Sequence, residues 1–307
     1  MKSIKYWPSY RKLVRWLNLH FPEIVCKVRF RMLFGRKLDL KNPQDLNEKI
    51  LWLSLYGDKR LWVRCADKYA VRCYVEEKGL GDILVKLYGK WDRVEDIEWN
   101  KLPKSFVLKS NNGAGTVLVV KDKSLIDIEE TKDLLNRWLM LDVSGSTTEF
   151  HYGDIKPCII AEETLEPTDA DLAVSSSIID YKIWCFNGKP DSVLVCSNRQ
   201  PQGGCALSVY DLDWNYCPNA SVFNDEHFEA PRPIPRPAKF KEMLEVAEKL
   251  SADFPEVRVD LYYINDRIYF GELTFTSLGG TMTYYTQQEL LRMGQKIDLS
   301  AVKKIKK

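Results

Sequence analysis

The segment from residue 257 to residue 275 alternates between apolar and polar side chains on both sides of a short polar loop. Because successive side chains of a strand point to opposite faces, this alternation predicts an antiparallel hairpin with strands at 257–263 and 268–275. One face is apolar and the other is polar. The polar face carries Arg258, Asp260, Glu272 and Thr274.

A three-residue loop, Asn265 to Arg267, places Asp260 directly opposite Glu272, whereas a two-residue loop mixes the two faces. Two carboxylates on neighbouring strands repel each other unless a cation lies between them. Hard oxygen ligands of this kind suit Mg²⁺. The alternative is a solvated strand face on which the acidic residues are incidental.

A second predicted hairpin carries a lysine and a glycine-rich tip. Its strands are 105–109 and 116–121, and the turn is Asn111-Asn112-Gly113-Ala114-Gly115. The hairpin supplies the cation of Lys109 together with flexible backbone N–H groups that can close over phosphates. It is not a Walker loop, because the chain has no G-x-x-x-x-G-K-[ST] motif.

The other elements follow from periodicity and turn signals. The first hundred residues are predicted to be mostly helical, with one helix capped by Asp45 and another that opens near Ala66. Further predicted helices are 128–138 and 240–250, and a short strand is 157–163. Strands 178–186 and 192–196 form a hairpin at Asn187-Gly188, and the proline-rich segment 231–237 is an extended connector.

Composition limits the class of protein. The 307 residues correspond to about two domains. A net charge of +2, from 45 basic and 43 acidic residues, argues against non-specific nucleic-acid binding. No apolar run approaches the length of a membrane span, and no secretory signal is recognised, so the expected location is the cytoplasm. The eight cysteines contain no C-x-x-C and are expected to be reduced, buried thiols.

Residues 9–19 form a basic amphipathic helix by their spacing, with Arg11, Lys12 and Arg15 among apolar residues. Such a helix can make peripheral contact with the anionic inner face of a membrane. The alternative is that its aromatic side packs on the body of the protein.

Six blocks in a fixed order resemble the ATP-grasp superfamily, and specifically its TupA-like branch, which is found among genes for bacterial surface polysaccharides. They run from about residue 35 to residue 280. The blocks are Asn47-Glu48-Lys49, residues 66–72, the Lys109 strand with its glycine-rich turn, residues 155–163, residues 180–190, and Arg258-Val259-Asp260 with residues 270–274.

The resemblance implies an α+β fold in which two α+β lobes with antiparallel sheets grip ATP, preceded by a mainly helical N-terminal region. The expected domains are a helical region at 1–100, a small lobe with the glycine flap at 101–164, and a large lobe with the metal-binding strands at 165–307.

The resemblance also implies the residues that bind ATP. Lys68 and Lys109 resemble the two phosphate-binding lysines, and the turn with Asn112, Gly113, Ala114 and Gly115 resembles the flap over them. The adenine-binding segment of the family corresponds to Glu162, Glu163 and Leu165 in this chain. The acid that binds the ribose hydroxyls lies near the position of Asp180.

Asp260 and Glu272 match the magnesium ligands, and Arg258 matches the arginine that steadies the transferred phosphoryl group. The third ligand is usually asparagine in this superfamily, whereas this chain has Thr274, which leaves the number of magnesium ions open. Three further candidates are Lys182 for contact with phosphate or substrate, His151 for contact with substrate or the incoming amine, and Arg199 as a clamp on a carboxylate. Plain structural or surface roles are the alternatives for His151 and Arg199.

The implied activity is that of an ATP- and Mg²⁺-dependent ligase, which forms an amide through an acyl phosphate. Its partners would be a carboxylate, such as an acidic sugar of a polysaccharide precursor for a capsule, O-antigen or teichuronopeptide-type polymer, and an amino acid or other amine. Alternatives are an ATP-grasp kinase that phosphorylates a sugar and a non-catalytic nucleotide-binding protein. The oligomeric state stays open.

Overall fold

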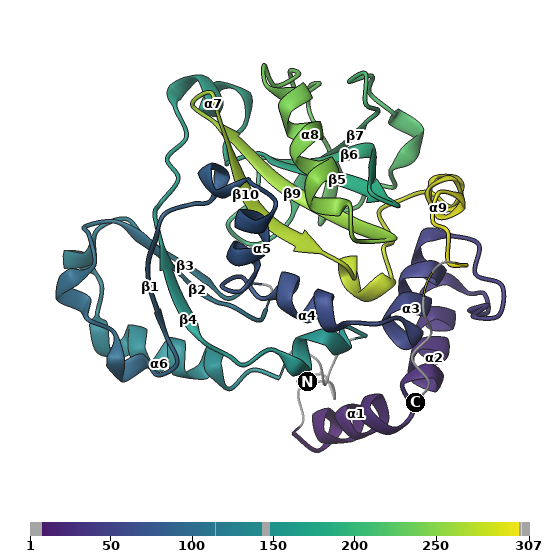
Figure 1. The fold of residues 1–307 in the computed structure, drawn as a ribbon, viewed down its shortest axis with the longest axis horizontal. Coiled ribbons are helices and arrows are strands. Elements are labelled where there is room, and N and C mark those ends of the chain that lie inside the picture. The colour runs from purple at the N-terminus through teal and green to yellow at the C-terminus, as the bar shows by residue number, and fades with distance from the viewer. Residues whose placement is uncertain (1–7, 114, 143–147, 301, 303–307) are drawn as a thin grey trace. The chain divides into compact units, whose positions relative to one another are not determined.

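The computed structural model describes residues 8–113, 115–142, 148–300 and 302 (Figure 1). Contacts divide the chain into two units, one with residues 1–20 and 59–166 and the other with residues 21–58 and 167–307. The helices of the first hundred residues are therefore shared between the units. The predicted division at residues 100 and 164 stays a prediction.

The first unit contains a four-stranded antiparallel sheet in the order β1-β4-β2-β3. Its helices and strands are α1 (Pro8–His20), α4 (Arg60–Ala66), α5 (Val71–Glu77), β1 (Leu87–Trp91), β2 (Phe106–Ser110), β3 (Val117–Val120), α6 (Ile128–Leu139) and β4 (Ile159–Glu162). Short 3₁₀ segments lie between them at Gly81–Ile83, Val94–Asp96, Trp99–Lys101, Lys123–Leu125 and Phe150–Asp154.

One face of this sheet forms the core of the first unit. Phe106 and Leu108 of β2 pack there with Ile159 of β4 and with Leu135 and Trp138 of α6. Because side chains alternate along a strand, the residues between them point to the other face. Those residues include the predicted phosphate-binding Lys109 and the predicted adenine-binding Glu162.

The second unit contains a six-stranded sheet in the order β10-β9-β5-β6-β7-β8, in which only the β7–β8 pair is parallel. Its helices and strands are α2 (Pro22–Phe34), α3 (Leu46–Tyr56), α7 (Asp169–Val174), β5 (Asp180–Phe186), β6 (Lys189–Ser197), β7 (Cys205–Tyr210), β8 (His227–Glu229), α8 (Phe240–Ser251), β9 (Glu256–Ile264), β10 (Arg267–Thr274) and α9 (Gln287–Gln295). Two 3₁₀ segments lie at Pro218–Ala220 and Ser277–Gly280.

Helices cover both faces of the six-stranded sheet. Helix α8 lies on the face of Cys185, whose Sγ donates to the carbonyl oxygen of Ala247 at 3.8 Å. The opposite face packs Trp184 against Leu46 of α3 and Met293 of α9. Helix α3 starts where its sequence indicated, with a reciprocal capping box between Asp45 and Glu48.

The predicted pairing of Asp260 with Glu272 is confirmed, but the predicted three-residue loop is wrong. The turn contains only Asn265 and Asp266, both at positive φ, and Arg267 already pairs with Ile264. A β-bulge between Phe270 and Glu272 then restores the register. Gly271 permits this bulge, because a Cβ there would lie 2.9 Å from the carbonyl oxygen of Asp260.

Periodicity missed several short elements, most of which bury only part of their surface, whereas β7 is buried along its whole length. Strand β1 lies within the region expected to be mostly helical, and β7, β8, α7 and α9 were not predicted. Strand β1 is an edge strand without a buried residue, so its sequence lacks a strong apolar alternation. The thiols are free as expected, but Cys73 is exposed, in contrast to the six that are buried.

Candidate nucleotide and phosphoryl-transfer site

In the first unit, Lys109 and Glu162 form an ion pair on the face of the four-stranded sheet opposite its hydrophobic core. The Nζ atom of Lys109 lies 2.7 Å from Oε2 of Glu162. Arg72 of α5 approaches the other carboxylate oxygen at 3.3 Å. Glu162 is buried, so the two cations neutralise a carboxylate that is largely shielded from water. With two cations on one carboxylate, the group keeps a net positive charge.

The glycine-rich turn after β2 is anchored by Asn111. Its side-chain amide donates to the carbonyl oxygen of Lys156 at 3.0 Å, and its Oδ1 accepts from the backbone N–H of Cys158 at 2.8 Å. Lys68, a predicted phosphate-binding residue, donates from Nζ to the carbonyl oxygen of Gly113 at 2.5 Å. The structure therefore brings Lys68 to the turn predicted to cover the phosphates.

Asn112 and Gly115 of the turn have different surroundings. Within the described chain, Oδ1 of Asn112 is buried and accepts no hydrogen bond. Gly115 adopts φ +77°, and a Cβ added to it would have no described atom within 4 Å, so it lies in open space. Ala114, also predicted to contact nucleotide, lies outside the described residues.

The predicted adenine-reading segment follows β4. The backbone N–H of Glu163 donates to the carbonyl oxygen of Lys86 at 2.9 Å, so that N–H already has a partner. The side chain of Glu163 is exposed, and Leu165 is partly exposed. The carboxylate of Glu162 serves Lys109 and Arg72 in this structure, which is a role that the sequence did not indicate for it.

His151, a candidate for contact with substrate, lies in the core of the first unit. Its ring meets Trp62 edge-on at 5.7 Å and lies 4.4 Å from Tyr152. Burial, together with the positive charge of Lys59, lowers the pKa of His151 to about 3, so the imidazole is neutral at physiological pH. This placement supports a packing role, and the predicted catalytic role stays a prediction.

In the second unit, Arg258 and Lys182 converge on the buried carboxylate of Asp260. Arg258 binds this carboxylate in a bidentate manner. Its Nε donates to Oδ1 and its Nη2 donates to Oδ2, each at 2.7 Å. Lys182, opposite Asp260 on β5, donates from Nζ to Oδ2. Arg258 also donates from Nη1 to Oγ of Ser277 at 2.7 Å.

All three groups of this network stay charged. Burial alone would lower the pKa of Lys182, but the carboxylate of Asp260 raises it above its ordinary value. Burial alone would raise the pKa of Asp260, but Arg258 and Lys182 lower it. The network therefore holds two fixed cations around one anion, an arrangement that stabilises added negative charge.

Glu272 and Thr274 lie beside this network on β10. Thr274 donates from Oγ1 to Oε1 of Glu272 at 3.0 Å and accepts from Nη2 of Arg258 at the same distance. Glu272 also lies 3.6 Å from Arg258, and its side chain is 42% exposed, whereas Asp260 is buried. Arg258, Asp260, Glu272 and Thr274 therefore lie together on the polar face of the β9–β10 hairpin, as the alternation predicted.

The donor set fits Mg²⁺ in kind, because Asp260, Glu272 and Thr274 offer hard oxygen atoms on one face. Both oxygens of Asp260 already bind cationic side chains, so this residue can ligate a metal only if one of those side chains moves away. In the part of the chain that the structure describes, no group of three or more His, Cys, Asp or Glu side chains is arranged as a metal site.

Asp180, the predicted ribose-binding acid, binds Arg199, the predicted carboxylate clamp. Nε of Arg199 lies 3.1 Å from Oδ2 of Asp180, and Nη2 donates to the same oxygen. Lys182 lies 4.0 Å from that oxygen. Asp180, Lys182 and Asp260 therefore form one row of alternating charge, and Arg199 extends it.

Arg72 and Ser277 were not among the predicted site residues. Both hold a functional candidate in place, Arg72 through Glu162 and Ser277 through Arg258. Arg72 lies in one of the motif blocks, so its position was a usable signal. The contact of Ser277 needs the turn at Leu278 and Gly279, both at positive φ, and no short-range pattern indicated that turn.

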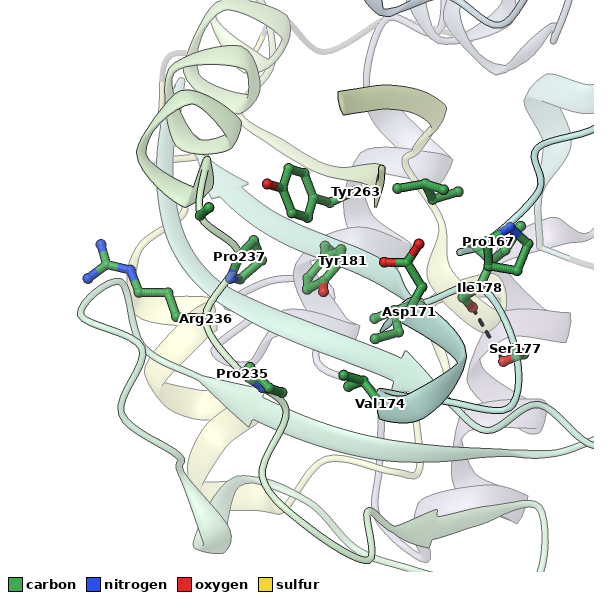
Figure 2. Close-up of a pocket in the computed structure, with 13 residues that line it drawn as sticks. Pro167, Asp171, Val174, Ser177, Ile178, Tyr181, Pro235, Arg236, Pro237 and Tyr263 are labelled. Atoms are coloured by element: carbon green, nitrogen blue, oxygen red, sulfur yellow. Dashed lines mark hydrogen bonds between the residues drawn. The ribbon is translucent and has the colours of Figure 1, made fainter. Parts of the chain in front are cut away.

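A separate pocket of about 150 Å³ lies in the second unit (Figure 2). Its walls come from α7, from the proline-rich segment before α8 and from strands β5 and β9, and Tyr181, Asp171 and Pro237 are among them. Tyr181 and Tyr263 belong to the strand face opposite Lys182 and Asp260. None of the predicted site residues lines this pocket.

A family model described as TupA-like ATP-grasp matches residues 48–298 of this chain. A search of curated proteins finds no match.

Solved structures with a similar fold are distant in sequence. The D-alanine–D-alanine ligase of Bacillus anthracis is 16% identical at a TM-score of 0.47, covering 80% of this chain and 73% of its own. The ADP complex of the N5-carboxyaminoimidazole ribonucleotide synthetase purK is 13% identical at a TM-score of 0.40, covering 71% and 46%. The phosphoribosylamine–glycine ligase of Thermotoga maritima is 11% identical at a TM-score of 0.39, covering 76% and 50%.

Proposed function

The chain belongs to the TupA-like ATP-grasp family, and from that premise we propose that it is an ATP- and Mg²⁺-dependent ligase that joins a carboxylate to an amine. The observation that carries the proposal is the buried network in which Arg258 and Lys182 flank Asp260, with the less buried Glu272 beside it. Such a preorganised group of charges stabilises the charge that develops during phosphoryl transfer.

The cations in this proposal have defined tasks. Lys68 and Lys109 of the first unit bind phosphate oxygens, and the turn at 111–115 covers them. Arg258 and Lys182 of the second unit stabilise the transferred phosphoryl group. Asp260, Glu272 and Thr274 would hold Mg²⁺, with an oxygen of Asp260 becoming available when phosphate oxygens attract Lys182 or Arg258. The metal would supply charge neutralisation at the phosphates.

The reaction needs no nucleophile from the protein. An oxygen of the substrate carboxylate attacks the γ-phosphorus of ATP, ADP departs, and an acyl phosphate forms. An amine then attacks the acyl carbon, loses a proton and displaces inorganic phosphate, which leaves an amide. His151 is buried in the first unit, which favours Arg199 over His151 as the residue that orients a substrate carboxylate.

The proposed substrates are an acidic sugar of a surface-polysaccharide precursor and an amino acid or other amine. The support is the membership of the TupA-like branch, whose members resemble this chain across the matched residues. Use of ATP agrees with action in the cytoplasm. No described helix is long and apolar enough to cross a membrane.

ADP release with Mg²⁺ and panels of uronic acids and amino acids tests the activity. We expect turnover that needs one acid and one amine together, and loss of turnover in Glu272→Gln but not in Glu248→Gln, an exposed glutamate of α8. No turnover with any pair, together with no ATP binding, rejects the proposal. A stable phosphorylated sugar made without an amine identifies a kinase instead. Unchanged nucleotide affinity in Asp260→Ala and Glu272→Ala favours a non-catalytic binding protein.

A further inference from the structure

Helix α2 presents a row of large apolar side chains to solvent. The exposed fractions of Ile24, Val28 and Met32 are 58%, 54% and 81%. Their spacing of four residues places them in one line along the helix. We name these three residues the apolar row. The opposite side of α2 holds the helix to the second unit through the buried Cys26 and Phe30.

Basic side chains flank the apolar row on both sides. At 100° per residue, Lys27 and Arg31 lie on one side of the row and Arg29 lies on the other. The single acidic residue of the helix, Glu23, binds Lys27 at 2.5 Å and accepts from the hydroxyl of Tyr56 at 2.9 Å. With three cations and one anion, the helix has a net charge of +2.

The function of the matched family does not account for this surface, because α2 precedes the matched residues 48–298. A second copy of the chain is a poor partner, since two such helices would bring like charges together. A row of apolar side chains bordered by basic ones suits an anionic membrane surface. The apolar side chains can insert among the acyl chains, and the basic side chains can bind lipid phosphates.

We propose that α2 docks the protein on an anionic membrane surface, with the apolar row inserted at the headgroup level and Lys27 and Arg31 on lipid phosphates. The helix lies along the surface and does not span it. At a rise of about 1.5 Å per residue its 13 residues give a contact roughly 20 Å long. The proposal is independent of the ligase activity, and it concerns a different helix from the one in the N-terminal prediction at residues 9–19.

Co-sedimentation of the full chain with vesicles tests the docking. Vesicles of phosphatidylcholine and phosphatidylglycerol are compared with vesicles of phosphatidylcholine alone. We expect Ile24→Ser/Val28→Ser/Met32→Ser to lower the partition coefficient on the anionic vesicles at least tenfold. The matched control is Leu125→Ser/Met140→Ser/Val222→Ser, which removes exposed apolar side chains elsewhere and should bind like the wild type. Met140 is 82% exposed, close to the value for Met32.

A charge series separates specific contact from general attraction. Lys27→Gln/Arg31→Gln should weaken binding to anionic vesicles several-fold more than Lys241→Gln/Lys249→Gln, which removes the same net charge from exposed positions of α8. Thermal unfolding midpoints should stay unchanged, because all replaced side chains are exposed.

Three results would overturn the proposal. One is equal binding of the apolar-row variant and the wild type. Another is equal binding of the wild type to neutral and anionic vesicles. The third is a wild-type dimer in sedimentation equilibrium that becomes a monomer in the apolar-row variant without any vesicle affinity in either protein, because the row would then be an interface between copies.

Discussion

The Nζ atom of Lys109 lies 2.7 Å from Oε2 of Glu162, on the face of the four-stranded sheet that the hydrophobic core does not cover. Lys109 and Glu162 occupy diagonal positions on antiparallel strands, since Val107 pairs with Glu162 and Lys109 pairs with Ile160. The carboxylate, shared with Arg72, orients the ammonium group before any ligand arrives. This preorganisation makes Lys109 the most informative residue for testing nucleotide binding.

Lys109→Ala should weaken ATP binding at least tenfold, because a hydrogen bond to a charged group contributes about 1.5–3 kcal/mol. Lys49→Ala is the matched control. Lys49 belongs to another of the family motif blocks but donates to the carbonyl oxygen of Ile297 at 2.7 Å, and its replacement should change affinity less than about twofold. Calorimetric titration with ATP measures both, and equal losses would contradict the assignment of Lys109 to phosphates.

Asp260→Asn should destabilise the fold by about 3–5 kcal/mol, because Arg258 and Lys182 are left buried beside a neutral partner. Glu272→Gln should cost about 1 kcal/mol or less, since its side chain is partly accessible to water. Urea unfolding compares the two free energies. A small loss for Asp260→Asn would show that the network does not depend on this carboxylate.

Gly271→Ala should disturb the bulge that sets Glu272 opposite Asp260. The new methyl group would lie 2.9 Å from the carbonyl oxygen of Asp260, so we expect a loss of about 1–3 kcal/mol and lower Mg²⁺-dependent turnover. Gly81→Ala is the control, because its methyl group would meet only the side chain of Glu76 at 3.7 Å. Unfolding and turnover of Gly271→Ala that match the control would refute the role of the bulge.

Glu256→Gln should stabilise the protein at pH 7. Glu256 is buried without a hydrogen-bond partner for either oxygen in the described chain, and burial raises its pKa well above 4.5. The folded state therefore holds a proton that the unfolded state releases, and stability falls as the pH rises from 4.5 toward the raised pKa. The stability that Glu256→Gln adds should vanish near pH 4, where Glu256 is protonated in both states. Glu248→Gln, at an exposed site, should show no such dependence when unfolding is followed against pH.

The pH dependence of stability that His151 causes should have the opposite sign to that of Glu256. Because burial lowers its pKa to about 3, the unfolded state takes up a proton below pH 6.5 while the folded state does not. The contribution of His151 to the free energy of unfolding is fully present above pH 6.5. It falls by about 1.4 kcal/mol per pH unit as the pH drops toward 3. His151→Gln should remove this slope. The difference in unfolding free energy between the variant and the wild type, measured from pH 7 to pH 4, would be constant if His151 were accessible.

The amino-acid sequence by itself determined the elements with a strong period or a strong turn signal. The capping residues fixed the start of α3, Asn187-Gly188 fixed the turn between β5 and β6, and alternation placed Arg258, Asp260, Glu272 and Thr274 on one face. Each of these signals comes from neighbours along the chain, and the same local chemistry acts in the folded state.

Only the tertiary structure decided which groups those residues meet. The bulge at Gly271, the partners of Asp260 and the ion pair between Arg72 and Glu162 depend on strands and helices that are far apart in the sequence. The burial of His151 and Glu256 and the exposure of the apolar row on α2 have the same origin. A local pattern shows which side of an element is apolar, but the packing of distant elements decides whether that side becomes covered.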